Sequence, residues 1–190
     1  MKTLKTIVVV HGLSGSGKTT FAQLLLSIIG GAYINADQVR ASISRDLKFT
    51  PADRRAQAYR MGKLAALALE DLHTNGCMFI EPGTTAHFNK TVIVDFVSPT
   101  RQTRNIFDVA AISAHNYSNT RLLDVWMNTI GREDCRYPDT AAIYEHPHHT
   151  TQEVRGYQTV DQMRTIAQKF SAQYSLPPVI QDASTKTNPI

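Results

Sequence analysis

The segment from Gly12 to Thr19 reads Gly-Leu-Ser-Gly-Ser-Gly-Lys-Thr and satisfies the pattern GxxxxGK[ST] at every fixed position. The apolar run Ile7–Val10 precedes it, and a helical pattern follows it from Thr20 to Ile29. Glycines let the backbone turn its N–H groups inward around an anion, and the following helix adds the positive end of its dipole. A strand, this loop and a helix in that order predict a loop that cradles nucleotide phosphates.

The last two residues of this loop carry side chains suited to phosphoryl chemistry. Lys18 is expected to reach the β- and γ-phosphates of ATP and to act in catalysis, and the Thr19 hydroxyl is expected to ligate Mg²⁺. ATP and Mg²⁺ are therefore the predicted cofactors. The residues expected to bind the nucleotide are Gly12, Ser14, Gly15, Ser16, Gly17, Lys18, Thr19 and Thr20.

Beyond the loop, short β-branched runs alternate with helical stretches, which is typical of βαβ units. We expect an α/β fold with a mostly parallel sheet flanked by helices. The predicted strands are Thr6–His11, Ala32–Asn35, Cys77–Glu81, Thr91–Val97 and Leu122–Met127. The predicted helices are Lys18–Ile29, Asp37–Arg45, Ala52–Thr74, Gln102–Ser113 and Val160–Gln173.

Length and composition favour one globular domain. The chain has 190 residues, of which 42% are hydrophobic and 19% charged, enough to bury a core without disulfides. We expect residues 1–181 to form that domain and the polar stretch 182–190 to be a flexible tail. No apolar run approaches the ~20 residues of a membrane span, and the two cysteines form no CxxC pair. These features predict a cytoplasmic protein without a membrane partner.

Two segments lack the periodicity of regular elements. Pro82–Lys90 is rich in Gly, Thr, His and Asn, and Gly131–Gly156 shows no clear repeat of apolar residues. Irregular segments in an otherwise regular α/β domain often carry lids or substrate-binding loops. We expect these two segments to contribute to function rather than to the sheet.

Three segments after the phosphate loop follow the patterns of one enzyme family. Asn35–Arg40 reads Asn-Ala-Asp-Gln-Val-Arg, and Arg45–Arg54 reads Arg-Asp-Leu-Lys-Phe-Thr-Pro-Ala-Asp-Arg. Val97–Arg104 reads Val-Ser-Pro-Thr-Arg-Gln-Thr-Arg. In order and spacing they resemble the DGDNxR, DLGFSxxDR and ISPxRxxR patterns of adenylyl-sulfate kinases. The resemblance covers over half of the chain and implies the P-loop nucleoside-triphosphate kinase fold.

The resemblance also implies roles for individual residues. Asp37 would act beside the transferred phosphoryl group, as the catalytic base or as a Mg²⁺ organiser. The residues that would bind the acceptor are Arg40 and Arg54 on its anionic group, Phe49 stacked on its base, and Ser98 and Pro99 lining its pocket. These residue types suit such roles, because guanidinium groups bind phosphate-like groups bidentately and an aromatic face holds a heterocycle.

The chain departs from the family pattern at the ends of two predicted strands. Asn35 replaces the first acid of DGDN, and Asp95 follows the apolar run Val92–Val94 where the family usually carries a small apolar residue. An acid after such a strand often organises Mg²⁺. The predicted metal-binding set is therefore Thr19, Asp37 and Asp95, although Asp95 could instead be an ordinary strand end.

The largest departure comes after Met127, where the family's lysine- and arginine-rich lid has no counterpart. Arg132 and Arg136 lie where a lid arginine would neutralise phosphoryl charge, and Arg136 is the predicted catalytic residue of this segment. The stretches Val94–Thr100 and Val125–Ile130 resemble a branch common in bacteriophage genomes. That branch is similar to kinases that phosphorylate 5-hydroxymethyluracil in phage DNA.

Two acceptors therefore compete for an ATP-dependent kinase. The favoured acceptor is the 5-hydroxymethyl group of hydroxymethylated DNA, which would place the protein in host cytoplasm. It is suggested by the missing lid, by the extra loop Pro82–Lys90, and by a basic cluster of Arg40, Arg45, Lys48, Arg54, Arg55, Arg60 and Lys63. The alternative acceptor is the 3′-hydroxyl of adenylyl sulfate, suggested by Arg40, Phe49 and Arg54. A nucleotide-binding switch without catalysis is a third possibility, which Asp37 and the complete loop disfavour.

Overall fold

The computed structural model describes residues 4–74, 90–113 and 119–176, with the side chains of 71–74 excepted. The described strands form one sheet in the order β2-β3-β1-β4-β5, and every neighbouring pair is parallel. This confirms the predicted parallel sheet. The strands are β1 (Lys5–Gly12), β2 (Ala32–Asn35), β3 (Thr91–Asp95), β4 (Thr120–Asn128) and β5 (Gln152–Arg155).

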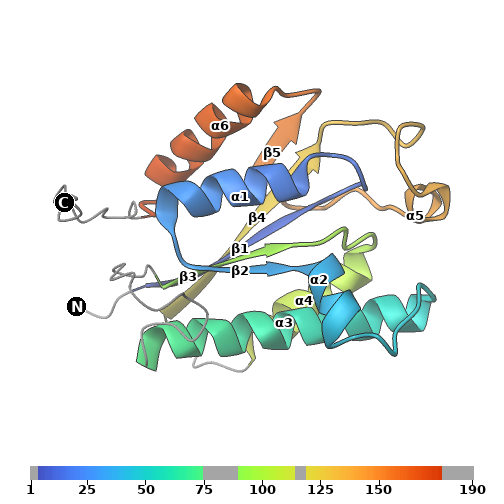
Figure 1. Cartoon of the computed structure of the whole chain (residues 1–190), viewed down its shortest axis with the longest axis horizontal. Coiled ribbons are helices and arrows are strands. Elements are labelled where there is room, and N and C mark those ends of the chain that lie inside the picture. The colour runs from blue at the N-terminus through green and yellow to red at the C-terminus, as the bar shows by residue number, and fades with distance from the viewer. Residues whose placement is uncertain (1–3, 75–89, 114–118, 177–190) are drawn as a thin grey trace, which may run out of the picture.

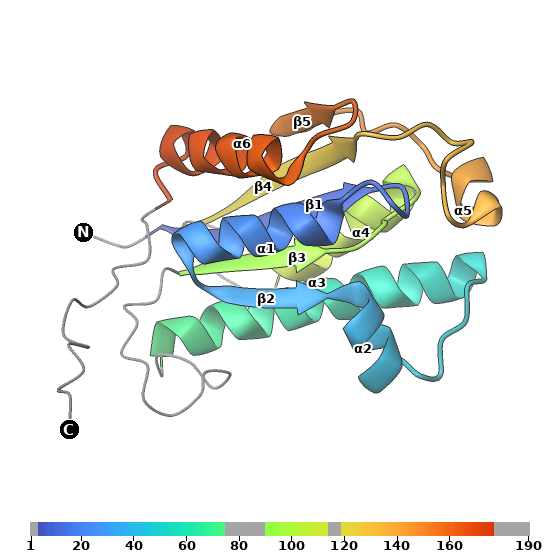
Figure 2. The ribbon, with the colours of Figure 1, turned by 45° about the horizontal axis from the view of Figure 1, so that its top comes forward.

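Helices cover both faces of the sheet (Figures 1 and 2). One face packs against α1 and α6, and the other packs against α3 and α4. None of the helices in the described part of the chain is both long enough and apolar enough to cross a membrane. The helices are α1 (Lys18–Ile29), α2 (Ala36–Ser42), α3 (Pro51–Thr74), α4 (Arg101–Ile112), α5 (Pro138–Ala142) and α6 (Val160–Gln173).

Strand β1 lies at the centre of both cores because its side chains alternate between the two faces of the sheet. Val8 and Val10 join the core under α1 and α6, whereas Ile7 and Val9 join the core under α3 and α4. The chain leaves β1 into α1 on one face and leaves β3 into α4 on the other. The carboxyl ends of these neighbouring strands therefore border a crevice, where α/β proteins bind their ligands.

Most predicted elements agree with the structure. The predicted bounds of β2, α1 and α6 are confirmed at both ends. Helix α2 begins at Ala36, one residue before its predicted start, because the Asn35 side chain accepts hydrogen bonds from the backbone of the first turn. The predicted strand Cys77–Glu81, residues 82–89 of the predicted loop and the predicted tail at 182–190 lie outside the described residues.

The segment Gly131–Gly156 differs from expectation, because it contains α5 and β5. Helix α5 is only five residues long and begins with Pro138, so it is too short to produce a helical repeat. Strand β5 is four residues long and pairs with β4 at the edge of the sheet. Neither element has a sequence pattern long enough to reveal it, and each is held by contacts with distant residues.

Gly62 offers a test of how closely α3 and α4 pack. A Cβ at this position would lie 2.6 Å from the Phe107 carbonyl oxygen and 2.7 Å from the Ala110 Cβ. In an isolated helix Gly62→Ala would stabilise by about 1 kcal/mol. Here overpacking against backbone costs about 1–3 kcal/mol, so we expect a net loss of stability. Urea denaturation of the variant and of the parent protein measures this difference in the free energy of unfolding.

The matched control on the same helix is Leu67→Ala, because the Leu67 side chain is 67% exposed. Its free energy of unfolding should change by less than about 0.5 kcal/mol. A Gly62→Ala variant more stable than the parent protein would mean that α3 and α4 do not pack as described.

Candidate active site

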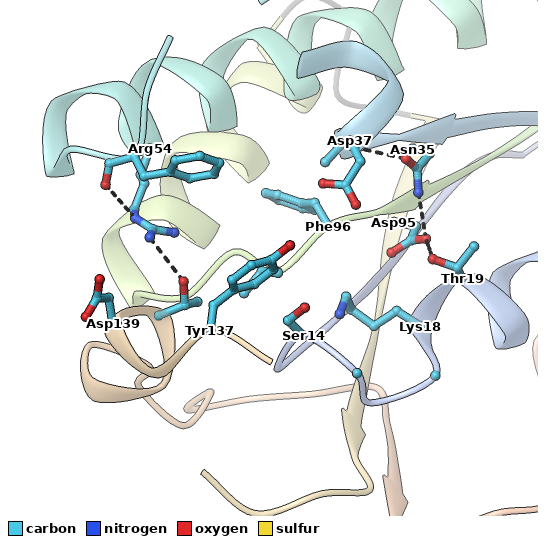
Figure 3. A pocket seen from close by; sticks show the side chains of 16 residues that line it. Ser14, Lys18, Thr19, Asn35, Asp37, Arg54, Asp95, Phe96, Tyr137 and Asp139 are labelled. Atoms are coloured by element: carbon cyan, nitrogen blue, oxygen red, sulfur yellow. Dashed lines mark hydrogen bonds between the residues drawn. The ribbon is translucent and has the colours of Figure 1, made fainter. Parts of the chain in front are cut away.

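A pocket of about 480 Å³ opens at the carboxyl ends of β1, β2 and β3. Its walls come from the phosphate loop, the start of α2, the start of α3, the chain after β3, and α5 with the residue before it (Figure 3). The lining residues are Ser14, Gly15, Gly17, Lys18, Thr19, Asn35, Ala36, Asp37, Phe49, Arg54, Asp95, Phe96, Val97, Tyr137, Asp139 and Thr140.

The phosphate loop has the backbone that its glycines predict. Gly12 has a φ of 150° and Gly17 a φ of 80°. A Cβ on Gly12 would lie 2.5 Å from the Met127 carbonyl oxygen, so the loop approaches β4 too closely for any side chain there. The Ser16 hydroxyl is buried and has no hydrogen-bond partner among the described residues. An unsatisfied hydroxyl inside this loop fits a phosphate ligand.

Lys18 begins α1 and is only 8% exposed. Its Nζ donates a hydrogen bond to the Leu13 carbonyl oxygen, 2.7 Å away, and points across the pocket floor in Figure 3. Burial lowers the pKa of the Lys18 ammonium, while the Asp95 and Asp37 carboxylates act in the opposite direction. A cation with little water around it gains strongly from an incoming polyphosphate.

Beside Lys18, the Asp95 carboxylate accepts hydrogen bonds from side chains of α1 and β2. Its Oδ2 accepts from the Thr19 hydroxyl at 2.6 Å, the Tyr33 hydroxyl at 3.0 Å and the Asn35 amide at 3.1 Å. Burial, and then the Asp95 charge, raise the pKa of Tyr33 to about 12, so this phenol stays a neutral donor. Asp95 therefore lies beside the loop threonine, within the predicted metal-binding set.

Asp37 lies in the first turn of α2, and its carboxylate points into the pocket (Figure 3). Oxygen ligands of this kind suit Mg²⁺, which proteins commonly hold with one or two carboxylates and the substrate's phosphates. In the described ranges no three His, Cys, Asp or Glu side chains gather around one point. The residues present therefore fit a cation shared with a nucleotide, held by Thr19, Asp95 and Asp37.

Phe49 lines the pocket, and two guanidinium groups lie over its ring. The Arg40 Cζ is 4.7 Å and the Arg54 Cζ 5.6 Å from the centre of its ring. Arg54 donates to the Phe49 carbonyl oxygen at 3.0 Å and to the Thr140 hydroxyl at 3.1 Å. Burial lowers the pKa of both arginines, and the positive charge of Arg54 lowers that of Arg40 further. The structure thus brings these three predicted acceptor residues together.

Several predicted site residues do not line this pocket. Ser98 and Pro99 are buried, and their carbonyl oxygens accept hydrogen bonds from Arg104 and from the Glu145 backbone. They precede α4 and do not line this pocket, so their role at the acceptor stays a prediction. The lining also lacks four further predicted residues, namely Arg40, Gly12, Ser16 and Thr20.

Arg136, the predicted catalytic arginine, is also outside the lining. Its guanidinium lies over the Tyr137 ring, with the Cζ 5.6 Å from the ring centre, and the residue is exposed. Only its backbone reaches the phosphate loop, because its N–H donates to the Ser14 carbonyl oxygen. The catalytic role of Arg136 stays a prediction.

Seven residues that line the pocket were not among the predicted site residues: Asn35, Ala36, Phe96, Val97, Tyr137, Asp139 and Thr140. Phe96 and Val97 directly follow Asp95, so their place after a central strand could have indicated them. Tyr137, Asp139 and Thr140 come from α5 and the residue before it, and they belong to the segment after Met127 where only Arg132 and Arg136 were considered as site residues. Figure 3 shows the Tyr137 ring inside the pocket and Asp139 beside Arg54.

The basic cluster of the sequence does not act as one charged surface. The two terminal guanidinium nitrogens of Arg60, Nη1 and Nη2, donate to the Asp46 carboxylate, at 2.6 and 2.7 Å. The Lys63 ammonium lies 5.6 Å from the centre of the Tyr59 ring. Arg40 and Arg54 face Phe49. Within the predicted polyanion surface, Arg60 is therefore paired with Asp46 and Arg54 lines the pocket.

The family model of adenylylsulphate kinase matches residues 4–164 of the chain. The chain belongs to the adenylylsulphate kinase family. Adenylyl-sulfate kinase of Bacillus licheniformis is 31% identical over 106 residues, which cover 53% of this chain and 45% of that relative. The bifunctional enzyme NodQ of Rhizobium sp. is 28% identical over 139 residues, which cover 70% of this chain and 18% of NodQ. The matches thus span less than half the length of these relatives.

Solved structures share the fold of this adenylylsulphate kinase family member. APS kinase CysC of Mycobacterium tuberculosis, solved with AMPPNP and APS, has a TM-score of 0.67 at 20% identity. That match covers 92% of this chain and 99% of CysC. A sugar kinase of Janibacter sp. has a TM-score of 0.60 at 14% identity, over 91% and 95% of the two chains. At these identities the likeness concerns the fold, and it confirms the predicted P-loop kinase fold.

The two carboxylates of the pocket should respond differently to removal of their charge. Asp95 bonds to Thr19 and is buried, so Asp95→Asn should raise the Mg²⁺ concentration that nucleotide binding requires. Asp37 is exposed to the pocket, so Asp37→Asn should keep nucleotide affinity and lower turnover about 100-fold or more. Calorimetry with a non-hydrolysable ATP analogue and a phosphotransfer assay separate the two effects. Loss of nucleotide affinity with high residual turnover in Asp37→Asn would show that Asp37 is structural.

Proposed function

We propose that this chain transfers the γ-phosphoryl group of ATP to a hydroxyl of a small anionic nucleotide, with adenylyl sulfate as the acceptor. The observation that carries this proposal is the position of Phe49 and Arg54 in the same pocket as Lys18 and Asp37. An aromatic face suits the acceptor's base, and guanidinium groups suit its anionic group. Membership of the adenylylsulphate kinase family supports the same acceptor.

The chemistry follows from positions and charges rather than from covalent catalysis. Lys18 would hold the β- and γ-phosphates, and the backbone N–H groups of the phosphate loop would surround them. Thr19, Asp95 and Asp37 would hold Mg²⁺, which when bound neutralises charge on the transferred group. The Asp37 carboxylate, on the acceptor side, would orient the attacking hydroxyl or accept its proton.

This choice reverses the order of the two acceptors in the sequence analysis. Hydroxymethylated DNA was favoured there because of the basic cluster, but Arg60 is paired with Asp46, and Arg40 and Arg54 turn toward Phe49. The relationship to the phage kinases has no support in the relatives described above. A DNA acceptor and a location in host cytoplasm therefore stay predictions that depend on the missing lid and on the loop Pro82–Lys90, of which residues 82–89 lie outside the described part of the chain.

A labelling experiment distinguishes the two acceptors. The protein is incubated with γ-labelled ATP and Mg²⁺, together with either adenylyl sulfate or duplex DNA that contains 5-hydroxymethyluracil. We expect label in the product of adenylyl sulfate. Label confined to DNA, with a steep decline as salt rises, would overturn the proposal in favour of the DNA acceptor.

A pair of arginine variants tests the pocket directly. Arg54→Ala should raise the KM for adenylyl sulfate by about tenfold or more, because a charged hydrogen bond contributes about 1.5–3 kcal/mol, and it should leave the KM for ATP unchanged. The matched control is Arg60→Ala. Arg60 lies on α3 like Arg54, but its guanidinium is paired with Asp46. The control should leave both KM values unchanged. An equal effect of both variants would contradict an acceptor site at Phe49 and Arg54.

A further inference from the structure

Asn35 uses both ends of its side-chain amide. Its Oδ1 accepts hydrogen bonds from the backbone N–H groups of Asp37 at 3.0 Å and Gln38 at 3.1 Å, which caps α2. Its Nδ2 donates to the Asp95 Oδ2 at 3.1 Å and to the Tyr33 hydroxyl at 3.3 Å. Two N–H donors on one side and a carboxylate on the other allow only this orientation of the amide.

The neighbouring strands explain why one side chain reaches both groups. Asn35 and Asp95 are register partners at the carboxyl ends of the parallel strands β2 and β3. Strand β2 ends at Asn35, and α2 begins at the next residue. The amide therefore lies between the carboxylate beside the phosphate loop and the helix that carries Asp37.

Other residue types at position 35 would lose one of these two functions. Aspartate could cap α2 but would place a second carboxylate 3.1 Å from a buried one. Serine could cap α2 but has no amide to donate to Asp95. Alanine could do neither. Asparagine is thus the residue whose side chain can accept from the helix and donate to the carboxylate together.

We propose that Asn35 is a positioning residue that couples the Asp95 carboxylate of the nucleotide side to α2 on the acceptor side. This inference rests on the proposed function, because it takes a Mg²⁺-bound nucleotide to occupy the pocket beside Asp95. A bound nucleotide would restrain Asp95, Asp95 would restrain the amide, and the amide would hold the first turn of α2. The Asp37 carboxylate would then be held more firmly once the nucleotide has bound.

Three variants separate the hydrogen bond that Asn35 donates to Asp95 from the cap that it provides for α2. Tyr33→Phe removes one donor from Asp95 and leaves the α2 cap intact. Asn35→Ser removes another donor and keeps a capping hydroxyl, whereas Asn35→Ala removes both the donor and the cap. Tyr33→Phe is the matched control, because it disturbs the same carboxylate without touching the helix.

The first measurement is the binding of a non-hydrolysable ATP analogue as a function of Mg²⁺ concentration. All three variants should raise the half-maximal Mg²⁺ concentration by about tenfold or more, as expected for the loss of one hydrogen bond to a charged group. Unchanged Mg²⁺ dependence in Tyr33→Phe and Asn35→Ser would overturn the proposed link to Asp95. This measurement needs no acceptor, so it does not depend on adenylyl sulfate being the substrate.

The second measurement is hydrogen exchange at the backbone amides of Asp37 and Gln38. Without nucleotide, exchange should be about fivefold faster in Asn35→Ala than in Asn35→Ser, because a helix cap contributes about 1 kcal/mol. The Mg²⁺-bound analogue should slow exchange in the parent protein and in Tyr33→Phe, but not in Asn35→Ser. If the analogue slows exchange in Asn35→Ser as much as in the parent protein, the nucleotide stabilises α2 through contacts other than the Asn35–Asp95 bond.

If the Asn35→Ser variant does not fold, exchanging the side chains of positions 35 and 95 tests the same pairing. Asn35→Asp alone should lower the melting temperature, because it places two carboxylates side by side. Adding Asp95→Asn should restore it, since the pair again contains one amide and one carboxylate and α2 keeps its cap. No recovery in the double variant would contradict the pairing. If the parent protein binds no nucleotide, the proposed function fails, and the exchange rates without nucleotide still test the cap.

Discussion

The pairing of β1 between β3 and β4 is the constraint on which the candidate site depends. β1 is parallel to both neighbours, so the three carboxyl ends meet at one edge of the sheet. The phosphate loop starts from the end of β1, and Asp95 stands at the end of β3. The register Val10↔Asp95 places that carboxylate one strand away from the start of the loop. Lys18 and Thr19 then meet Asp95 because the loop curls back over this edge.

The segment after β4 forms the remaining wall of the pocket because it is anchored to the same strand end. Leu13 of the phosphate loop packs with Cys135, Ala141 and Tyr144 in a small core of its own. The His11 ring, fully buried before the loop, lies 3.2 Å from the Tyr144 hydroxyl. These contacts hold α5 near the phosphate loop, as Figures 1 and 2 show beyond the strand ends. They explain why residues without a family motif line the pocket.

Comparison of the predicted and observed sites shows which inferences a sequence supports. Lys18, Thr19, Asp37 and Asp95 line the pocket as predicted, because the phosphate-loop motif marks the first two and the ends of β2 and β3 mark the others. Phe49 and Arg54 were predicted only through a family resemblance. Ser98 and Pro99 followed the same resemblance but do not line this pocket, and their carbonyl oxygens accept hydrogen bonds from Arg104 and from the Glu145 backbone. A motif predicts which residues are near a site, while the backbone decides which side chains enter it.

The sequence by itself determined the phosphate loop, the alternation of strands and helices, and the residues at the strand ends. These depend on local rules: glycine conformations, helix caps and the periodicity of apolar residues. Only the tertiary structure decided that Asn35 bonds to Asp95, and that Thr140 bonds to Arg54. Those pairs are 60 and 86 residues apart. The order of the strands and the packing of α5 set their proximity, and no local pattern carries that information.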